Sequence, residues 1–283
     1  MNGSSASTER HVAADGTELL VRAWPAPADP VGHVVILHGL AEHSGRYEHV
    51  AGWLAAGGLA VHAFDQRGFG GSGGRRAWAE DVASLHEDVA DRARAVRARS
   101  GGLPVVLYGH SLGGLLALGA VLDGTVEVDL LVLSGPSIGA SVPLATRVGV
   151  AVLGRVAPSV ELPNRLRGEQ LSRDPKVGEW YAADPRNHHR TTAHLGRVLL
   201  AEVTRVNAIL DRLSVPALVI HGADDTIVPP AASEPLGRLP GVERRLYPGI
   251  RHELHNEPEG AAIVGDVAAW LRKRIESAQI PSG

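Results

Sequence analysis

The chain has 283 residues, 44% of them hydrophobic, which suits one large domain, or a domain with an insertion, better than two independent halves. Its net charge of −3 argues against a broad nucleic-acid-binding surface, so we expect no nucleic-acid partner. The chain lacks cysteine, which excludes disulfides, thiolate catalysis and cysteine-based zinc sites.

The two ends of the chain are polar. The first ten residues, MNGSSASTER, lack the apolar region of a secretion signal, and we interpret residues 1–9 as a disordered lead. Residues 278–283 are interpreted as a disordered tail. No run of 18 apolar residues occurs, so no membrane-spanning helix is expected. These features predict a cytoplasmic protein.

Buried strands and helices alternate along most of the chain. The first strand, HVVILHG at 33–39, is a continuous apolar run of the kind found in parallel strands covered on both faces. Further strands are predicted at 59–65, 104–109, 129–135, 216–222 and 242–249. Helical segments are predicted over 47–58, 78–100, 112–122 and 261–277. This alternation predicts an α/β protein with a mostly parallel sheet and helices on both faces.

Residues 136–213 interrupt the alternation. They contain no convincing strand and several helical patches separated by proline and glycine. Because this interval lies between two predicted sheet strands, we interpret it as a helical cap over the carboxyl ends of the strands, where open parallel sheets bind ligands. The predicted core then comprises 10–135 and 214–277.

Three stretches fit the nucleophile-elbow pattern G-x-S-x-G: GGSGG at 70–74, GHSLG at 109–113 and GPSIG at 135–139. An elbow requires a strand that ends abruptly, a strained turn with the serine at its tip, and a helix that starts at once. GGSGG follows its strand only after several loop residues, and no helix comes directly behind it. This stretch is predicted to be a loop.

The other two stretches both follow a predicted strand. In GPSIG, Pro136 restricts the residue before it, and Pro143 would interrupt the second turn of any following helix. GHSLG is preceded directly by PVVLY and followed directly by LGGLLALGAVL. Ser111 is therefore the predicted nucleophile.

A serine nucleophile needs a base, and the base needs an orienting acid. On this kind of sheet the three follow in the order serine, acid, histidine. HGADD and YPGIRHELH each follow a predicted strand downstream of Ser111, which places Asp225 and His252 on loops at the same sheet edge. Asp224 and His255 are the alternatives. Alternatively, Asp225 only caps a turn and His252 is an ordinary loop histidine.

An acyl-transfer reaction also needs two N–H donors for the oxyanion. The residue after the nucleophile, Leu112, supplies one backbone N–H, and the loop after the first buried strand supplies the other, from Leu40. HELHN at 252–256 misses the zinc pattern H-E-x-x-H at its last position, and no phosphate-binding or dinucleotide fingerprint occurs. We expect neither a metal nor a cofactor.

Several stretches together resemble the monoacylglycerol lipases, α/β-hydrolases of the lysophospholipase-like branch, and the resemblance runs from about residue 10 to 275. They are HGLAEHSGRY (38–47), DQRGFGGSGG (65–74), GHSLGG (109–114), LSRDP (171–175), WYAADP (180–185), HGADDTIVPP (221–230) and YPGIRHELHNEPE (247–259). The resemblance implies an α/β-hydrolase fold with a helical cap. It also implies Ser111, Asp225 and His252 as the catalytic triad, and Leu40 and Leu112 as the oxyanion donors.

The resemblance further assigns Glu42, Arg46, His255 and, from the cap, Tyr181 to the glycerol end of the substrate site. The alternative is that Glu42 and Arg46, four residues apart, form a helical ion pair and that Tyr181 is simply packed. The sequence departs from the family at DQRGFGG, where DHxGHG is usual, and at Leu112, where methionine is frequent.

The implied reaction is hydrolysis of a small-molecule lipid ester, monoacylglycerol, to fatty acid and glycerol through an acyl-enzyme. The alternatives are a broad-specificity carboxylesterase or lysophospholipase, and a non-catalytic binding protein on a hydrolase fold. The segment 141–158 is apolar except at Arg147 and Arg155. The resemblance implies that it forms a cap helix at an acyl tunnel that also contacts lipid surfaces transiently, which would make the protein peripherally membrane-associated. A plain packing helix is the alternative.

Overall fold

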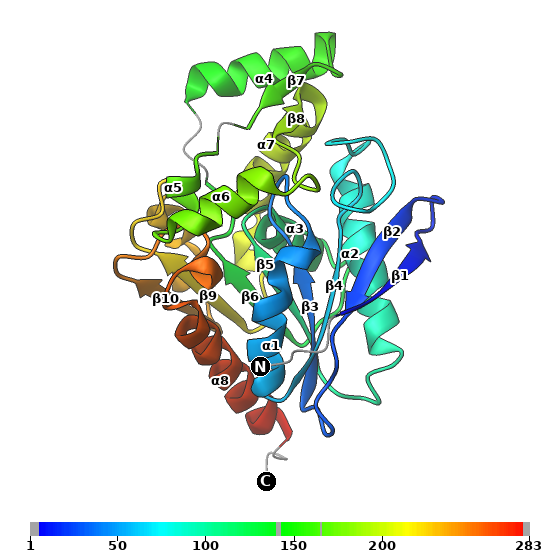
Figure 1. Ribbon diagram of the computed structural model, residues 1–283, viewed down its shortest axis with the longest axis vertical. Helices are drawn as coiled ribbons and strands as arrows, with labels where there is room; N and C mark the ends of the chain where they lie inside the picture. Colours follow the sequence, from blue (N-terminus) through cyan, green and yellow to red (C-terminus); the bar gives the residue numbers. More distant parts are fainter. Residues whose placement is uncertain (1–5, 140–142, 165, 280–283) are drawn as a thin grey trace.

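The computed structural model describes residues 6–139, 143–164 and 166–279, and its centre is an eight-stranded sheet in the order β1-β2-β4-β3-β5-β6-β9-β10 (Figure 1). The strands are β1 (Ser7–Val12), β2 (Glu18–Ala23), β3 (Gly32–Leu37), β4 (Leu59–Phe64), β5 (Val105–His110), β6 (Leu130–Ser134), β9 (Ala217–Gly222) and β10 (Val242–Tyr247). From β4 to β10 neighbouring strands pair in parallel, whereas β2 pairs antiparallel with both β1 and β4. The predicted parallel α/β sheet is confirmed.

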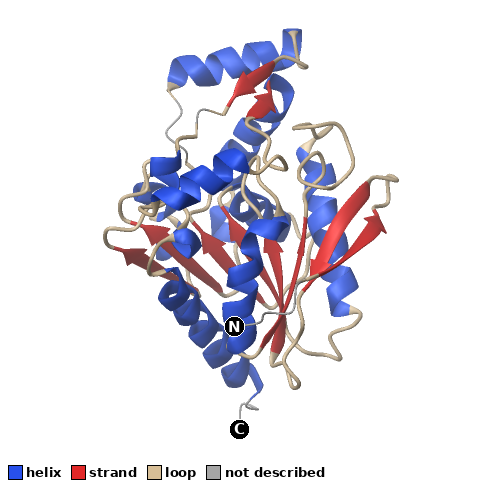
Figure 2. Cartoon of the chain, in the orientation of Figure 1, coloured by secondary structure: helices blue, strands red, loops and turns tan. Residues whose placement is uncertain are grey.

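Helices cover both faces of this sheet (Figure 2). The helices α1 (Glu48–Ala56) and α8 (Gly260–Gln279) pack on one face, and α2 (Val82–Arg97) and α3 (Leu112–Leu122) on the other. The central strand β5 shows the consequence: Val105 and Leu107 belong to the core under α2 and α3, while Val106 and Tyr108 belong to the core under α1 and α8. Both faces of the strand are therefore apolar, because successive side chains point to opposite faces.

The chain between β6 and β9 lies beyond the carboxyl ends of the strands, at the top of Figure 1. Its elements are α4 (Leu144–Val156), β7 (Glu161–Pro163), α5 (Gly168–Leu171), α6 (Pro175–Ala183), β8 (Arg190–Thr192) and α7 (Ala193–Ala208). The expectation that this interval contains no strand is wrong, since β7 and β8 pair antiparallel over three residues each. Segments this short carry no periodic apolar signal. The cap limits at 136 and 213 stay a prediction.

The two ends of the chain differ in part from expectation. Residues 7–9 belong to β1 rather than to a disordered lead, because β1 pairs along its whole length with β2. Helix α8 runs to Gln279, so 278–279 of the expected tail are helical. Residues 1–5 and 280–283 lie outside the described residues. No helix within the described ranges is long and apolar enough to cross a membrane.

Candidate active site

Ser111 stands at the junction of β5 and α3, in a strained backbone conformation with φ 51° and ψ −114°. A positive φ is costly for a residue with a side chain, so the surrounding packing must hold it. Glycine allows this packing: a Cβ at Gly113 would lie 2.2 Å from the Leu37 carbonyl oxygen, and one at Gly109 would lie 2.4 Å from the Gly113 carbonyl oxygen. The GHSLG stretch therefore forms the tight strand–turn–helix that an elbow requires.

Asp225 and His252 meet at the same edge of the sheet, on the loops that follow β9 and β10. Nδ1 of His252 lies 2.7 Å from Oδ2 of Asp225, and both residues are 4% exposed. The other carboxylate oxygen of Asp225 accepts backbone N–H groups from Ile227 and Val228, each at 2.9 Å. Burial opposes ionisation of Asp225, but hydrogen bonds from His221 and His252 outweigh it and hold its pKa below the usual value. The rival Asp224 is exposed to solvent.

The loop after β6 brings this pair and Ser111 together. A Cβ at Gly135 would lie 3.4 Å from Nδ1 of His252 and 3.5 Å from Oδ2 of Asp225. Two residues later, the Ser137 hydroxyl lies 3.0 Å from the Ser111 hydroxyl, and the Ser137 N–H donates to the Ser111 carbonyl. Within the described ranges, the Ser111 hydroxyl is hydrogen-bonded to Ser137 and not to His252. Ser137, the serine of GPSIG, is thus part of the site although sequence analysis set it aside as a nucleophile.

The two predicted oxyanion donors flank Ser111. Leu112 is the first residue of α3, so its N–H has no acceptor within the helix. Leu40 follows Gly39, where an added Cβ would lie 3.5 Å from the Ser111 Cβ. Both backbones therefore run beside the serine, as the predicted role requires.

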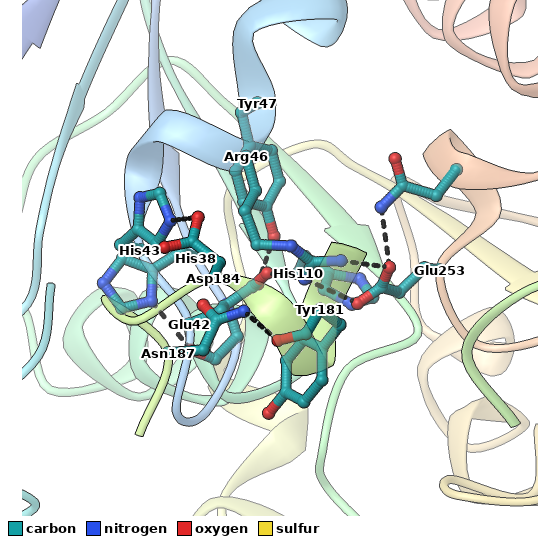
Figure 3. Close-up of polar contacts among 12 residues, drawn as sticks. His38, Glu42, His43, Arg46, Tyr47, His110, Tyr181, Asp184, Asn187 and Glu253 are labelled. Atoms are coloured by element: carbon teal, nitrogen blue, oxygen red, sulfur yellow. Dashed lines mark hydrogen bonds and ion pairs between the residues drawn. The ribbon is translucent and has the colours of Figure 1, made fainter. Parts of the chain in front are cut away.

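Glu42 and Arg46 belong to a buried charged network with a third member, Glu253 (Figure 3). Both guanidinium NH2 groups of Arg46 donate to the Glu253 carboxylate, each at 2.8 Å, and Arg46 is also paired with Glu42. Glu42 further accepts the Tyr47 hydroxyl at 2.7 Å and the Gly39 N–H at 2.5 Å. Burial alone would raise the pKa of Glu253, but the Arg46 cation holds it below the usual value.

The network has two consequences. The alternative of a Glu42–Arg46 ion pair is correct, although Glu42 precedes the short helix Ser44–Tyr47 rather than lying in it. Because two buried carboxylates share one guanidinium, the network carries a net negative charge. Glu253 was not predicted from the sequence, because its partner Arg46 lies 207 residues away.

Tyr181 and His255 contribute buried polar atoms that lack partners. The Tyr181 hydroxyl and both ring nitrogens of His255 have no hydrogen-bond partner among the described residues. Tyr181 comes from α6 and lies over Arg46, with the guanidinium carbon 5.0 Å from the ring centroid. His255 stacks on Tyr47 at 4.8 Å, and burial holds its pKa well below the usual value. Buried polar atoms without partners are costly, so these atoms are suited to bind a ligand's polar groups.

HELHN does not form a metal site in the part of the chain that the structure describes. His252 binds Asp225, Glu253 binds Arg46, and His255 stacks on Tyr47, so the three side chains have separate partners. No group of three acidic or histidine side chains in the described ranges is placed to hold a metal ion.

The chain matches a known protein family and is similar to several lipases. Residues 28–259 match the family described as serine aminopeptidase, S33 (Hydrolase_4). The chain is 37% identical over 279 residues to a monoacylglycerol lipase of Mycolicibacterium smegmatis, covering 96% of this chain and 99% of that protein. It is 31% identical over 276 residues to human monoglyceride lipase, covering 94% and 91%.

A solved structure supports the same assignment. The crystal structure of Paleococcus ferrophilus monoacylglycerol lipase matches with a TM-score of 0.80 and 27% identity, covering 96% of this chain and all of that one. The chain therefore belongs to the serine aminopeptidase S33 family of α/β-hydrolases, in its branch of monoacylglycerol lipases and related carboxylic ester hydrolases.

Proposed function

We propose that the protein hydrolyses monoacylglycerol to fatty acid and glycerol through an acyl-enzyme on Ser111. The observation that carries the proposal is the buried Asp225–His252 pair, 2.7 Å apart, at the loop that also contacts the strained Ser111. The names of the relatives specify the substrate class: the proteins from Mycolicibacterium smegmatis and human are monoacylglycerol and monoglyceride lipases.

The geometry supports a two-step reaction. Asp225 accepts the Nδ1–H of His252, which leaves Nε2 free to take the proton of the Ser111 hydroxyl, while Ser137 donates to the Ser111 oxygen. The serine oxygen attacks the ester carbonyl, and the Leu40 and Leu112 N–H groups stabilise the oxyanion. Glycerol leaves with the proton from His252. Water, deprotonated by the same histidine, then releases the fatty acid.

The glycerol end of the site combines two kinds of residue. The Tyr181 hydroxyl and the His255 ring have free hydrogen-bonding capacity for glycerol hydroxyls. Glu42 and Arg46 are already paired, so their proposed role is to position the loop after β3 and to set the local charge. A site with a net negative buried network disfavours an anionic headgroup. This argues for neutral glycerol over the phosphodiester of a lysophospholipid.

An apolar stripe on α4 supports transient contact with a lipid surface. Leu144, Val148, Val152 and Val156 recur at every fourth position and are 74%, 54%, 52% and 73% exposed. Helix α4 lies at the outer end of the molecule, away from the sheet (Figure 1). Exposed apolar stripes of this kind bind at lipid interfaces. We propose that α4 docks peripherally on the surface that holds the substrate.

Matched substrates test the proposed reaction. Fatty-acid release is measured for wild type and Ser111→Ala with a monoacylglycerol, a diacylglycerol and a lysophosphatidylcholine of one acyl chain, and amine release with an aminoacyl anilide. We expect monoacylglycerol to be turned over at least about tenfold faster than the others, and Ser111→Ala to lose about 10³-fold or more of that rate. Equal turnover of the three lipids would favour the broad esterase. Activity on the anilide alone would make the protein a peptidase.

A serine-reactive phosphonate separates an enzyme from a binding protein. Wild type is expected to bind one phosphonate per chain covalently, measured by intact mass, and Ser111→Ala to bind none. A wild-type chain that binds lipid but is never labelled would support the non-catalytic alternative.

A further inference from the structure

A cavity of about 510 Å³ lies at the edge of the sheet and is lined by the β1–β2 hairpin, β4 and the second half of α2. None of its lining residues belongs to the proposed triad, the oxyanion loops or the buried charged network. Its volume is in the range of small-molecule binding sites. Its floor is apolar and includes Val21, Val35, Ala63 and Val96.

Its rim is basic. Arg10, Arg22, Arg92 and Arg99 line the cavity, whereas Glu9 is the one carboxylate in the lining. This excess of positive charge is local, because the whole chain has a net charge of −3.

The four arginines differ in what they already bind. Arg10 donates to the Gly71 carbonyl, and Arg22 donates to the Ser44 hydroxyl. The guanidinium groups of Arg92 and Arg99 have no hydrogen-bond or ion-pair partner among the described residues. Both therefore retain their full set of donors for a ligand.

The neighbouring acidic and histidine groups do not neutralise this pair. Asp91, beside Arg92 on α2, is bound by His11. His62 faces the same cavity, and burial together with His33, Arg92 and Arg99 lowers its pKa to about 4, so it is neutral at pH 7. Burial, the largest cause, lowers the pKa of Arg92, and Arg99 adds to this shift; Asp91 and Glu9 oppose it without reversing it. A partly buried cation beside a second cation is unfavourable until an anion joins them.

We propose that this cavity binds an anionic amphiphile, a fatty-acid anion, with its carboxylate between Arg92 and Arg99 and its alkyl chain over the apolar floor. Guanidinium groups bind carboxylates through paired N–H donors. An inorganic anion is small beside a cavity of about 510 Å³ and would leave the apolar floor wet. An alkyl chain removes that apolar surface from water. Binding in this cavity does not depend on the reaction proposed for Ser111, although a fatty acid is also the product of that reaction.

Calorimetric titration of the full-length protein tests the site. Dodecanoate, dodecyl phosphate, dodecanol and inorganic phosphate are titrated into Ser111→Ala, so that no ester chemistry interferes. In the Arg92→Ala/Arg99→Ala double variant on this background, we expect dodecanoate affinity for one site per chain to fall about tenfold or more. Arg94→Ala is the matched control, because Arg94 lies on the same helix but pairs with exposed Glu87. Its dodecanoate affinity is expected to stay unchanged.

A second variant checks the alkyl part of the proposal. Ala95 lines the cavity from α2, and Ala95→Phe is expected to block the chain while leaving both arginines in place. Thermal melts verify that each variant is folded. The proposal is overturned if dodecanoate binds the double variant as tightly as the control, or if dodecanol or inorganic phosphate binds as tightly as dodecanoate. Tighter binding of dodecyl phosphate than of dodecanoate would also overturn it, in favour of a phosphate-headed lipid.

Discussion

The hydroxyl of Ser137 holds the predicted nucleophile in the structure. It lies 3.0 Å from the Ser111 hydroxyl, and with Ser137 as the donor the Ser111 proton stays available for His252. The Ser137 N–H also donates to the Ser111 carbonyl oxygen, so the loop after β6 is tied to the elbow. A hydroxyl that shares a hydrogen bond with the nucleophile fixes its rotamer and stabilises it before attack.

Ser137→Ala tests this positioning role. We expect kcat/KM for a monoacylglycerol to fall about tenfold, mainly through kcat, because the nucleophile loses its fixed rotamer. Ser137→Thr keeps the hydroxyl and is expected to recover most of the rate. Phosphonate labelling kinetics and the melting temperature are measured together. A purely structural role would instead lower the melting temperature and leave the labelling rate of the folded protein unchanged.

The Arg46 cation is expected to be worth more to stability than either of its acidic partners. Arg46→Met leaves Glu42 and Glu253 buried with no cation, which should lower the free energy of unfolding by about 3–5 kcal/mol. Glu253→Gln leaves a neutral Glu42–Arg46 pair, so its loss should be less than half as large. Urea unfolding of both variants checks the ranking. Equal losses would contradict the larger contribution expected of Arg46.

Two glycines show that helix α3 is closely packed at Gly113, whereas helix α4 is open at Gly149. Gly113 in α3 lies against the backbone after β3, whereas a Cβ at Gly149 in α4 would meet nothing within 4 Å. We expect Gly113→Ala to cost about 3 kcal/mol or more, and Gly149→Ala to stabilise by about 0.5–1 kcal/mol. Urea unfolding midpoints give both values. A tolerated Gly113→Ala would show that α3 shifts away from β3 without penalty.

Four of the predicted strands share one property. β5, β6 and β9 are fully buried and β3 is buried except at His33, and all four are mainly apolar, so their type follows from composition alone. The β1–β2 hairpin was missed because its strands are half-buried or exposed at the sheet edge and mix charged with apolar residues. Helix α2 begins at Val82 rather than 78, because the Asp81 carboxylate accepts the Ser84 N–H and caps it there.

The candidate site could be predicted where it follows from the order of motifs along the sequence. The elbow motif and the order of acid and histidine led to residues that the structure places at one edge, although their catalytic roles stay predictions. Ser137 and Glu253 were missed because their contacts join loops 26 and 207 residues apart. Such pairs follow from the folded sheet and not from any local pattern.

At the scale of the whole molecule, buried neutral histidines should make the free energy of unfolding depend on pH. Burial, as the largest cause, lowers the pKa of His62 and of His110 to about 4. The unfolded chain binds these protons near pH 6.5, so it gains protons first as the pH falls. The free energy of unfolding should therefore decrease between pH 6.5 and 4, by up to about 1.4 kcal/mol per pH unit for each histidine.

A histidine variant tests the acid effect. His62→Gln should flatten the decrease between pH 6.5 and 4, whereas the same change at His189, which is exposed, is the matched control. Urea unfolding is followed at several pH values for both. If the free energy of unfolding of His62→Gln decreased as steeply as that of wild type between pH 6.5 and 4, groups other than His62 would be responsible.

The shared Arg46 also constrains how this protein can be recombined with its relatives. One segment carries Glu42 and Arg46, and a second, far along the chain, carries Glu253 beside His252. A chimaera that exchanges only one of these loops inherits a buried charge without its counterpart unless the donor carries the same set. The two loops therefore behave as a single module for engineering, to be exchanged together or not at all.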